Sequence, residues 1–188
     1  MRIISGFLRG RLIKTVPGKT TKPTADNVKE AIFNILGRTL SGGIALDLYA
    51  GSGNLGIEAI SRGAGKCVFV EENRTAYNVI MENLKNLNIL DRVETFKMTD
   101  IKALNYFDNK RYRFDYVFLD PPYYHQKIMD ILDLFIDYDL LNPEATIVVE
   151  CIKELNINKD FTELKFMKAY IYGIKKIIIY KRCGDRYE

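Results

Sequence analysis

The sequence predicts an α/β fold with a doubly wound, mostly parallel sheet, because strand-like and helix-like segments alternate along the chain. The apolar runs at 44–50 and 66–72 are typical of buried parallel strands, and an amphipathic helix is expected after each. A glycine-rich turn joins the first strand to its helix. At 188 residues, 47% of them hydrophobic, we expect one domain spanning residues 1–188.

The rest of the chain completes a predicted seven-stranded sheet. Three further strands are expected at 92–98, 114–120 and 145–151, with a helix between the last two of them. Two apolar runs within 164–182 meet at Tyr172 and Gly173, which indicates an antiparallel C-terminal hairpin. The last residues, from Cys183 onward, are expected to form a loose tail.

The first part of the chain predicts a small hairpin followed by a helix. Apolar stretches interrupted by Gly6 and Gly10 indicate a hairpin extension over about residues 1–22. The next segment has apolar residues at helical spacing and ends near Gly37, and Thr24 is expected to be its N-cap.

Basic residues are concentrated in this N-terminal hairpin. Residues 1–25 contain six Lys or Arg and no acid, which leaves 22 bases against 24 acids elsewhere. The six are Arg2, Arg9, Arg11, Lys14, Lys19 and Lys22. Such a segment suits a polyanion such as nucleic acid, although an ordinary solvated hairpin explains the same charges.

Composition favours a cytoplasmic protein without a metal. No apolar run reaches the roughly 20 residues of a membrane span, and arginines interrupt any signal-like core near the N-terminus. Cys67, Cys151 and Cys183 are widely spaced and accompany a single histidine, so no structural zinc site is expected.

The glycine turn contains a GxGxxG motif between a strand and a helix. Gly51, Gly53 and Gly56 supply the three glycines, and Glu71 follows Gly51 by twenty residues. This arrangement is typical of a dinucleotide site, in which the acid binds a ribose, but it also fits glycines that serve only a tight turn.

Asp47 favours a cationic cofactor over a dinucleotide. This acid lies four residues before Gly51, where it gains nothing from an anionic pyrophosphate but attracts an ammonium or a sulfonium. S-adenosylmethionine carries both cations. We therefore expect Asp47, Gly51, Ser52 and Gly53 beside its methionine part, Glu71 on the ribose hydroxyls and Asp100 on the adenine amine. Asp100 can equally be a helix N-cap.

The motif Asp120-Pro121-Pro122-Tyr123 follows the fourth strand and suits methylation of a base amine. The lone pair of such an amine is delocalised into the ring, so acceptors must hold its N–H groups. Asp120 and a carbonyl of the rigid proline turn supply them, and Tyr123 stacks on the base, which has to be unpaired. A strand-end turn with an aromatic plug explains the same residues. Tyr124 and His125 are assigned no role.

These motifs together resemble class I, Rossmann-like methyltransferases that modify exocyclic amines of bases. Nearly the whole chain is similar to the bacterial 16S ribosomal RNA guanine-N2 methyltransferase family, through "MRIISGFLRGR", "KPTADNVKEAIFNIL", "LDLYAGSGNLGIEAISRGA", "FVEENRTA" and "LDPPYYHQK". Lys22 stands where that family commonly has arginine, which keeps the charge but loses a bidentate contact. The resemblance implies S-adenosylmethionine as cofactor and RNA contacts from Arg2, Arg9, Arg11, Lys14, Lys22 and Thr24.

Several functions remain open from the sequence. The proline motif suits adenine N6 in DNA or RNA as well as guanine N2, although a DNA enzyme usually needs an additional recognition domain. An NAD-dependent oxidoreductase would use the same glycine turn, and a non-catalytic RNA-binding module would keep the fold. We expect a monomer acting on small-subunit ribosomal RNA or on the ribosomal subunit.

Overall fold

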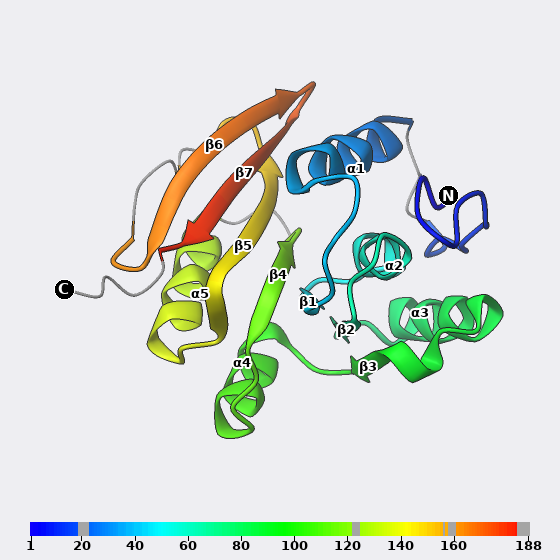
Figure 1. The fold of residues 1–188 in the computed structure, drawn as a ribbon, viewed down its shortest axis with the longest axis horizontal. Helices are drawn as coiled ribbons and strands as arrows, with labels where there is room; N and C mark the ends of the chain where they lie inside the picture. The colour runs from blue at the N-terminus through cyan, green and yellow to red at the C-terminus, as the bar shows by residue number, and fades with distance from the viewer. Residues whose placement is uncertain (19–22, 122–124, 156, 158–160, 184–188) are drawn as a thin grey trace.

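The computed structural model describes residues 1–18, 23–121, 125–155, 157 and 161–183. Within this part of the chain, seven strands form one sheet and five α-helices cover it (Figure 1). The strands are β1 Ile44–Asp47, β2 Lys66–Val70, β3 Val93–Phe96, β4 Phe114–Leu119, β5 Leu141–Ile152, β6 Leu164–Tyr172 and β7 Lys175–Arg182. The helices are α1 Pro23–Leu36, α2 Asn54–Ser61, α3 Arg74–Leu87, α4 Asp100–Asn109 and α5 His125–Asp137, with a 3₁₀ turn at Leu90–Arg92.

The strand order confirms the predicted doubly wound sheet. The order is β3-β2-β1-β4-β5-β7-β6, in which β1 to β5 run parallel and β7 is antiparallel to both of its neighbours. The direction of winding reverses between β1 and β4, where Asp47 lies opposite Phe118. Ligand sites of open α/β sheets lie beyond the carboxyl ends of the strands at this point.

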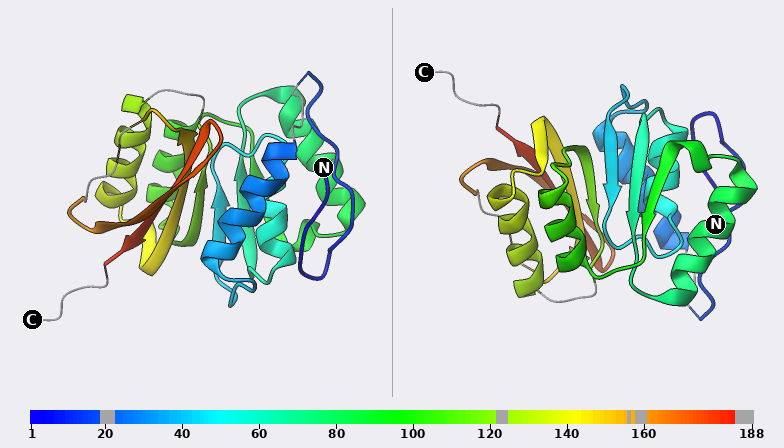
Figure 2. Two further views of the ribbon diagram at one scale, coloured as in Figure 1. Left: turned by 90° about the horizontal axis from the view of Figure 1, so that it is seen from above. Right: turned by 90° about the horizontal axis from the view of Figure 1, so that it is seen from below.

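Helices cover both faces of the sheet and create two cores. Figure 2 shows α4 and α5 on one side and α1, α2 and α3 on the other. Phe107 of α4 and Phe135 of α5 pack on the first face, whereas Phe33 of α1 and Ile57 of α2 pack on the second. Side chains alternate along a strand, so Asp47 and Phe118 belong to the second face.

Some element boundaries differ from those predicted. Helix α4 was expected only under the alternative in which Asp100 caps a helix; Thr99 takes the N-cap position instead, and the buried apolar side chains of α4 are few and lie between polar residues. Strand β5 begins at Leu141 instead of 145, through pairing with Phe114 across a bulge. Helix α1 begins at Pro23, so the prediction that Thr24 caps it is wrong: proline suits the first helical position, and Thr24 lies within the helix.

The N-terminal hairpin has a single antiparallel bridge, between Arg2 and Leu12, instead of two strands. Its backbone crosses α2 and α3, since the Phe7 amide donates to the Ser61 carbonyl. Gly6 is required at this crossing, because a Cβ there would lie 1.7 Å from the Ser61 oxygen. The predicted tail at 184–188 lies outside the described residues.

Candidate active site at the carboxyl edge of the sheet

Asp47 ends β1 as a buried acid on the face covered by α2. Its side chain is 4% exposed, and its carboxylate accepts a hydrogen bond of 2.9 Å from the Gly56 amide. Burial raises the pKa of Asp47 to about 7, the Gly56 amide opposes this rise, and the charges of Asp120 and Glu71 add to it. The three carboxylates are thus close enough to repel one another, as their positions at one sheet edge predicted.

The glycine turn is tightly packed at Gly56, against β2, and open at Gly51. A Cβ on Gly56 would lie 2.3 Å from the Phe69 ring, so this glycine lets α2 approach β2. The Gly53 amide closes the turn on the Ala50 carbonyl at 2.7 Å. A Cβ on Gly51 would meet no atom within 4 Å. A ligand can therefore approach the backbone at Gly51.

Glu71 follows β2 and binds the same turn. One carboxylate oxygen accepts from the Gly51 amide at 2.8 Å, and the other accepts from the Asn73 amide at 2.8 Å. The side chain stays partly exposed, and a carboxylate has about four acceptor positions. Glu71 thus fixes the turn and keeps acceptor capacity toward solvent.

Asp100 is the first residue of α4, directly after Thr99 at the N-cap position. Its carboxylate accepts from the Tyr49 hydroxyl at 2.7 Å and the Ile101 amide at 2.8 Å, and pairs with Lys127 at 2.8 Å. Burial raises the pKa of Asp100, but these three donors outweigh it and hold that pKa below its usual value. The acid is therefore held ionised by the loop after β1, by α4 and by α5.

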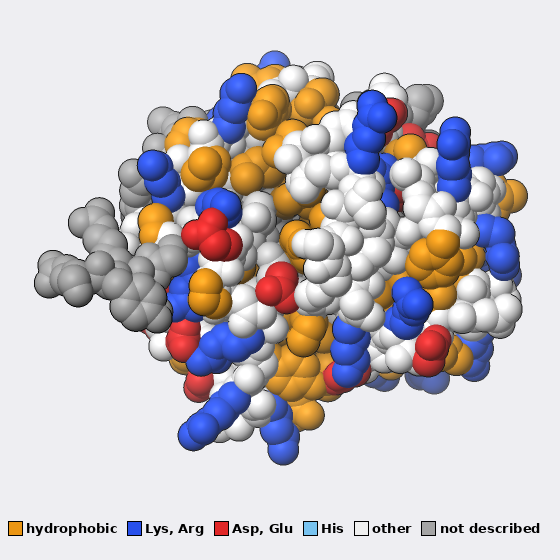
Figure 3. Space-filling model, viewed as in Figure 1, with side chains coloured by type: hydrophobic (Ala, Val, Ile, Leu, Met, Phe, Trp, Pro, Cys, Tyr) orange, Lys and Arg blue, Asp and Glu red, His pale blue; other side chains and the backbone are white. Residues whose placement is uncertain are grey.

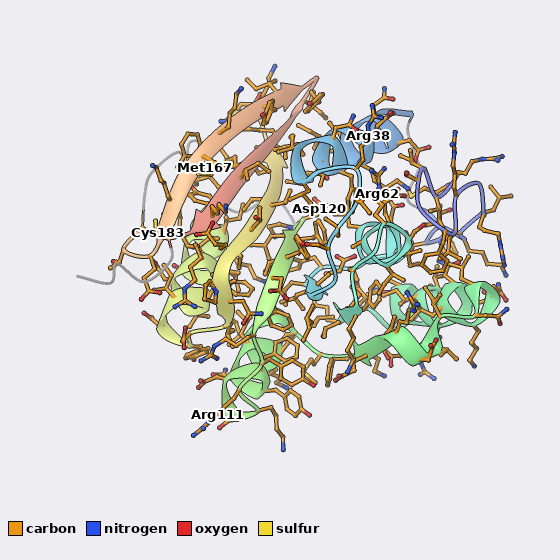
Figure 4. The ribbon with its side chains drawn as sticks, viewed as in Figure 1. Arg38, Arg62, Arg111, Asp120, Met167 and Cys183 are labelled. Atoms are coloured by element: carbon orange, nitrogen blue, oxygen red, sulfur yellow. The ribbon has the colours of Figure 1, made fainter. Side chains whose placement is uncertain are left out.

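Asp120 follows β4 on the same sheet face as Asp47. It lies two residues after Phe118, which packs on Phe33 of α1, and Figure 4 shows it at the end of β4. The side chain is 44% exposed and lies 3.7 Å from Lys175. Lys175 also pairs with Glu150 at 2.5 Å.

The proline motif is described only in its first half. Pro121 is buried directly after Asp120, which fixes the start of the turn. Pro122 and Tyr123, predicted to hold and stack the base, lie outside the described residues. Lys22 of the predicted RNA-binding set lies outside them as well.

The basic residues of the N-terminal segment that the structure describes are exposed: Arg2, Arg9, Arg11 and Lys14. Figure 3 shows Lys and Arg side chains along the side where this segment and α3 lie, with hydrophobic side chains between them. Phe7 of this segment is 59% exposed, and its ring lies 5.2 Å from the Arg92 guanidinium. Lys14 pairs with Glu82 of α3.

A buried ion network below the N-terminal segment was not predicted. Glu58 of α2 is fully buried and accepts from the amides of Ile4 and Ser5, at 2.9 and 3.0 Å. It also pairs with Lys29 of α1 at 3.2 Å and Arg62 at 2.8 Å. The signal was present in the sequence, as an acid within the apolar run of helix α2.

Asn83 connects the N-terminal segment to the glycine turn and was also missed. Its amide, on helix α3 and 2% exposed, donates 3.0 Å hydrogen bonds to the carbonyls of Lys14 and Ser52, and its oxygen accepts from the Lys14 amide at 2.8 Å. Ser52 thus contacts the predicted RNA-binding segment through one buried side chain. Apolar spacing along a helix does not identify such a residue, because a polar side chain occupies a buried position of the helix.

In the described part of the chain, no helix is long and apolar enough to cross a bilayer, and no group of three or more His, Cys, Asp or Glu side chains could hold a metal ion. Cys67, Cys151 and Cys183 are free thiols, and burial raises the pKa of Cys67 and Cys151.

Comparison with known proteins gives relatives over most of the chain. A Bacillus subtilis protein named "Putative rRNA methyltransferase YlbH" is 39% identical over 184 residues, which cover 98% of this chain and all of that protein. "Ribosomal RNA small subunit methyltransferase D" of Haemophilus influenzae is 36% identical, over 82% of this chain and 80% of that protein. The solved structure "Putative methyltransferase yhhF from Escherichia coli" has a TM-score of 0.86 at 28% identity and covers 98% of this chain and 99% of its own.

The strand order, the glycine turn after β1 and the antiparallel β7 define the class I methyltransferase fold. The acids at the carboxyl edge lie where that fold binds its ligands. More specifically, the chain belongs to the family described as Conserved hypothetical protein 95, whose model matches residues 1–181. The Haemophilus relative confirms the family resemblance predicted from the sequence motifs.

Proposed function

We propose that this protein transfers a methyl group from S-adenosylmethionine to the exocyclic N2 amine of a guanine in small-subunit ribosomal RNA. The observation that carries the proposal is the meeting of two acids at the switch point. Asp47 and Asp120 end neighbouring parallel strands on one face, close enough for Asp120 to raise the pKa of Asp47. The relatives named as ribosomal RNA methyltransferases support the choice of substrate.

The residues around the glycine turn fit the cofactor. Asp47 offers a buried carboxylate to its cationic amino acid part, Gly51 leaves the backbone open to contact, and Glu71 keeps acceptors for ribose hydroxyls. Bound there, S-adenosylmethionine supplies an electrophilic methyl group on a sulfonium. Such a cation favours the ionised form of Asp47, whereas the phosphates of a dinucleotide would oppose it.

Asp100 would act on the adenine amine from a fixed position. Its carboxylate is already held by Tyr49, Lys127 and the Ile101 amide. The carboxylate oxygens keep a further acceptor position, and the side chain loses little conformational freedom when a ligand binds there.

On the other side of the switch point, Asp120 would accept from the N–H groups of the target amine. This contact turns the nitrogen lone pair toward the methyl donor, so catalysis is mainly positioning. The methylated nitrogen is acidic and loses its proton readily, so no dedicated base is required. Pro122 and Tyr123 complete this part of the proposal as the turn and the stacking ring. The exposed Lys and Arg side chains of the N-terminal segment would bind RNA phosphates, together with Lys22 and Thr24.

The test is to map methylated nucleotides in ribosomal RNA from cells with and without this protein. We expect one small-subunit guanine to lose its N2 methyl group, and purified protein to restore it with labelled S-adenosylmethionine. Restoration on naked RNA and on assembled subunits would be compared separately.

Other results would contradict the proposal. Transfer to adenine N6 would reject guanine, and transfer to naked DNA alone would reject ribosomal RNA. Tight binding of reduced NAD without binding of S-adenosylmethionine would reject methyl transfer itself. A chain carrying Asp120→Ala that restored the modification in cells would show that this acid is not part of the site.

A further inference from the structure

A groove lies between α1 and the end of β6, beside the proposed base pocket. Its volume is about 640 Å³, and it is lined by Asn27, Glu30, Ala31, Asn34, Ile35, Tyr170 and Tyr172. Figures 1 and 2 show the tip of the β6–β7 hairpin next to α1. The exposed polar face of α1 thus lies opposite two tyrosines of an edge strand.

One residue that lines the groove is the cross-strand neighbour of a lysine beside Asp120. Tyr172 is paired with Lys175 in the β6–β7 register, and Lys175 lies 3.7 Å from Asp120. Both tyrosines pack on the second face of the sheet, to which Phe118 of β4 also belongs, two residues before Asp120. A chain that delivers one base to Asp120 can therefore place a neighbouring base in the groove.

The lining has the chemistry of a site for an unpaired nucleotide. Tyr170 and Tyr172 are two residues apart on one strand face, about 6.6 Å along it, and are partly exposed, so a base can stack on them. Lys168 lies with its ammonium 5.1 Å from the Tyr170 ring, where it can pair with a phosphate. Glu30 and Asn34 are exposed on α1 and offer acceptors and donors to a base edge.

We propose that this groove binds the unpaired ribonucleotide next to the target guanine, with its base stacked on the tyrosines and its amino edge facing Glu30. The inference rests on the proposed RNA methyl transfer and adds a second base-binding position to it. Phosphate contacts of the N-terminal segment carry no sequence information, whereas a stacked and hydrogen-bonded base does. The groove is thereby a determinant of which guanine is selected.

The test separates RNA binding from chemistry. Steady-state methyl transfer to small subunits from cells lacking the protein is measured for Tyr172→Leu and for Tyr170→Leu with Tyr172→Leu. We expect the KM for subunits to rise about tenfold, since a stacked base contributes about that factor or more. The kcat and the KM for S-adenosylmethionine should stay within about twofold, because neither tyrosine contacts the reacting atoms.

Matched variants show whether stacking is responsible. Tyr172→Phe keeps an aromatic face and should keep the wild-type KM. Glu30→Gln should raise the KM less than the tyrosine changes do. The control is Asp133→Asn, which removes an equally exposed helical acid from α5 on the opposite layer and should change nothing. Melting temperatures establish that each variant is folded.

A binding measurement distinguishes failure of the groove from failure of the proposed function. The dissociation constant for a fluorescein-labelled single-stranded RNA is measured on the same variants without cofactor, and about tenfold weaker binding by the double tyrosine variant is expected. Unchanged binding and unchanged KM in a folded double variant would overturn the groove. If wild-type protein binds this RNA more tightly than the double tyrosine variant but methylates no subunit, the proposed function alone is overturned.

Discussion

The two acids that end β1 and β4 are neighbours at one sheet edge but differ in how they are held. Asp47 is 4% exposed and bonded to the Gly56 amide, whereas the Asp120 side chain is 44% exposed and 3.7 Å from the Lys175 ammonium. Every acid on the proposed cofactor side accepts at least one backbone hydrogen bond: Asp47, Glu71 and Asp100. In the proposed function, a cofactor that is the same in each turnover suits buried or backbone-bonded acceptors, and a base that enters from RNA suits a solvent-exposed one.

The fixed side extends to the N-terminal segment. Glu58 binds the backbone at Ile4 and Ser5 while pairing with Lys29, and Asn83 joins Lys14 to Ser52. The proposed RNA-binding segment and the proposed cofactor turn are therefore one hydrogen-bonded unit. The open side consists of Asp120 and the groove between α1 and β6.

The largest effect is expected from breaking the fixed side at Glu58. Glu58→Gln would remove the carboxylate with which the buried Lys29 and Arg62 pair, and removing one partner of a buried pair costs about 3–5 kcal/mol. Urea unfolding measures this loss. The control is Glu82→Gln, whose exposed pair with Lys14 contributes about 0–1 kcal/mol. Equal free energies of unfolding for Glu58→Gln and Glu82→Gln would show that the buried network does not stabilise the fixed side.

Next in size is the loss of catalysis in Asp120→Ala. Removing one preoriented hydrogen-bonding group from the transition state lowers kcat by about 10²–10³. We expect that loss in methyl transfer, with RNA binding retained and with partial rescue by Asp120→Asn, whose oxygen still accepts. A kcat within a few fold of wild type would exclude Asp120 from the reaction.

A smaller effect is expected from Asp47→Asn, through the pH dependence of cofactor binding. The pKa of Asp47 is raised to about 7, so the acid becomes neutral below that pH and no longer attracts a cation. Wild-type affinity for S-adenosylmethionine should rise about tenfold from pH 6 to 8, following one titrating group, and calorimetry should find the variant flat. The control is Asp115→Asn, an acid bonded to the Ile44 amide at the other end of the sheet.

The same substitution predicts a change in stability. Because the pKa of folded Asp47, about 7, exceeds its ordinary value of 3.8, the folded state holds more protons than the unfolded chain between those values. The contribution of Asp47 to stability therefore falls as pH rises from about 4 to 7. Denaturant midpoints across this range should fall less steeply in Asp47→Asn than in wild type.

The smallest effect is expected at the N-terminal segment. Exchanging Arg9 and Arg11 for Gln removes two exposed charges without touching the buried network. Each phosphate contact contributes about 0.7 to the slope of log affinity against log salt, so the slope for single-stranded RNA should fall by about 1.4. The control pair is Lys102→Gln on α4 with Lys110→Gln directly after that helix. If the two double variants show the same slope of log affinity against log salt, the RNA does not bind at Arg9 and Arg11.

The sequence alone determined the sheet, the glycine turn and the edge where the acids meet. Periodic apolar segments and a GxGxxG turn are local signals, and parallel strands bring their carboxyl ends together whatever the loops contain. The C-terminal hairpin at Tyr172 and Gly173 was visible for the same reason.

Only the tertiary structure decided how those acids are bonded and what lies beside them. Glu58, Lys29 and Asn83 are buried polar residues whose partners are far away in sequence, and Lys175 reaches Asp120 from β7. The groove joins α1 to a strand more than 130 residues later. Such contacts follow from packing of whole elements, which no residue period encodes. The acids of the proposed site were therefore predictable from the sequence, whereas the contacts that hold them and the groove beside them were not.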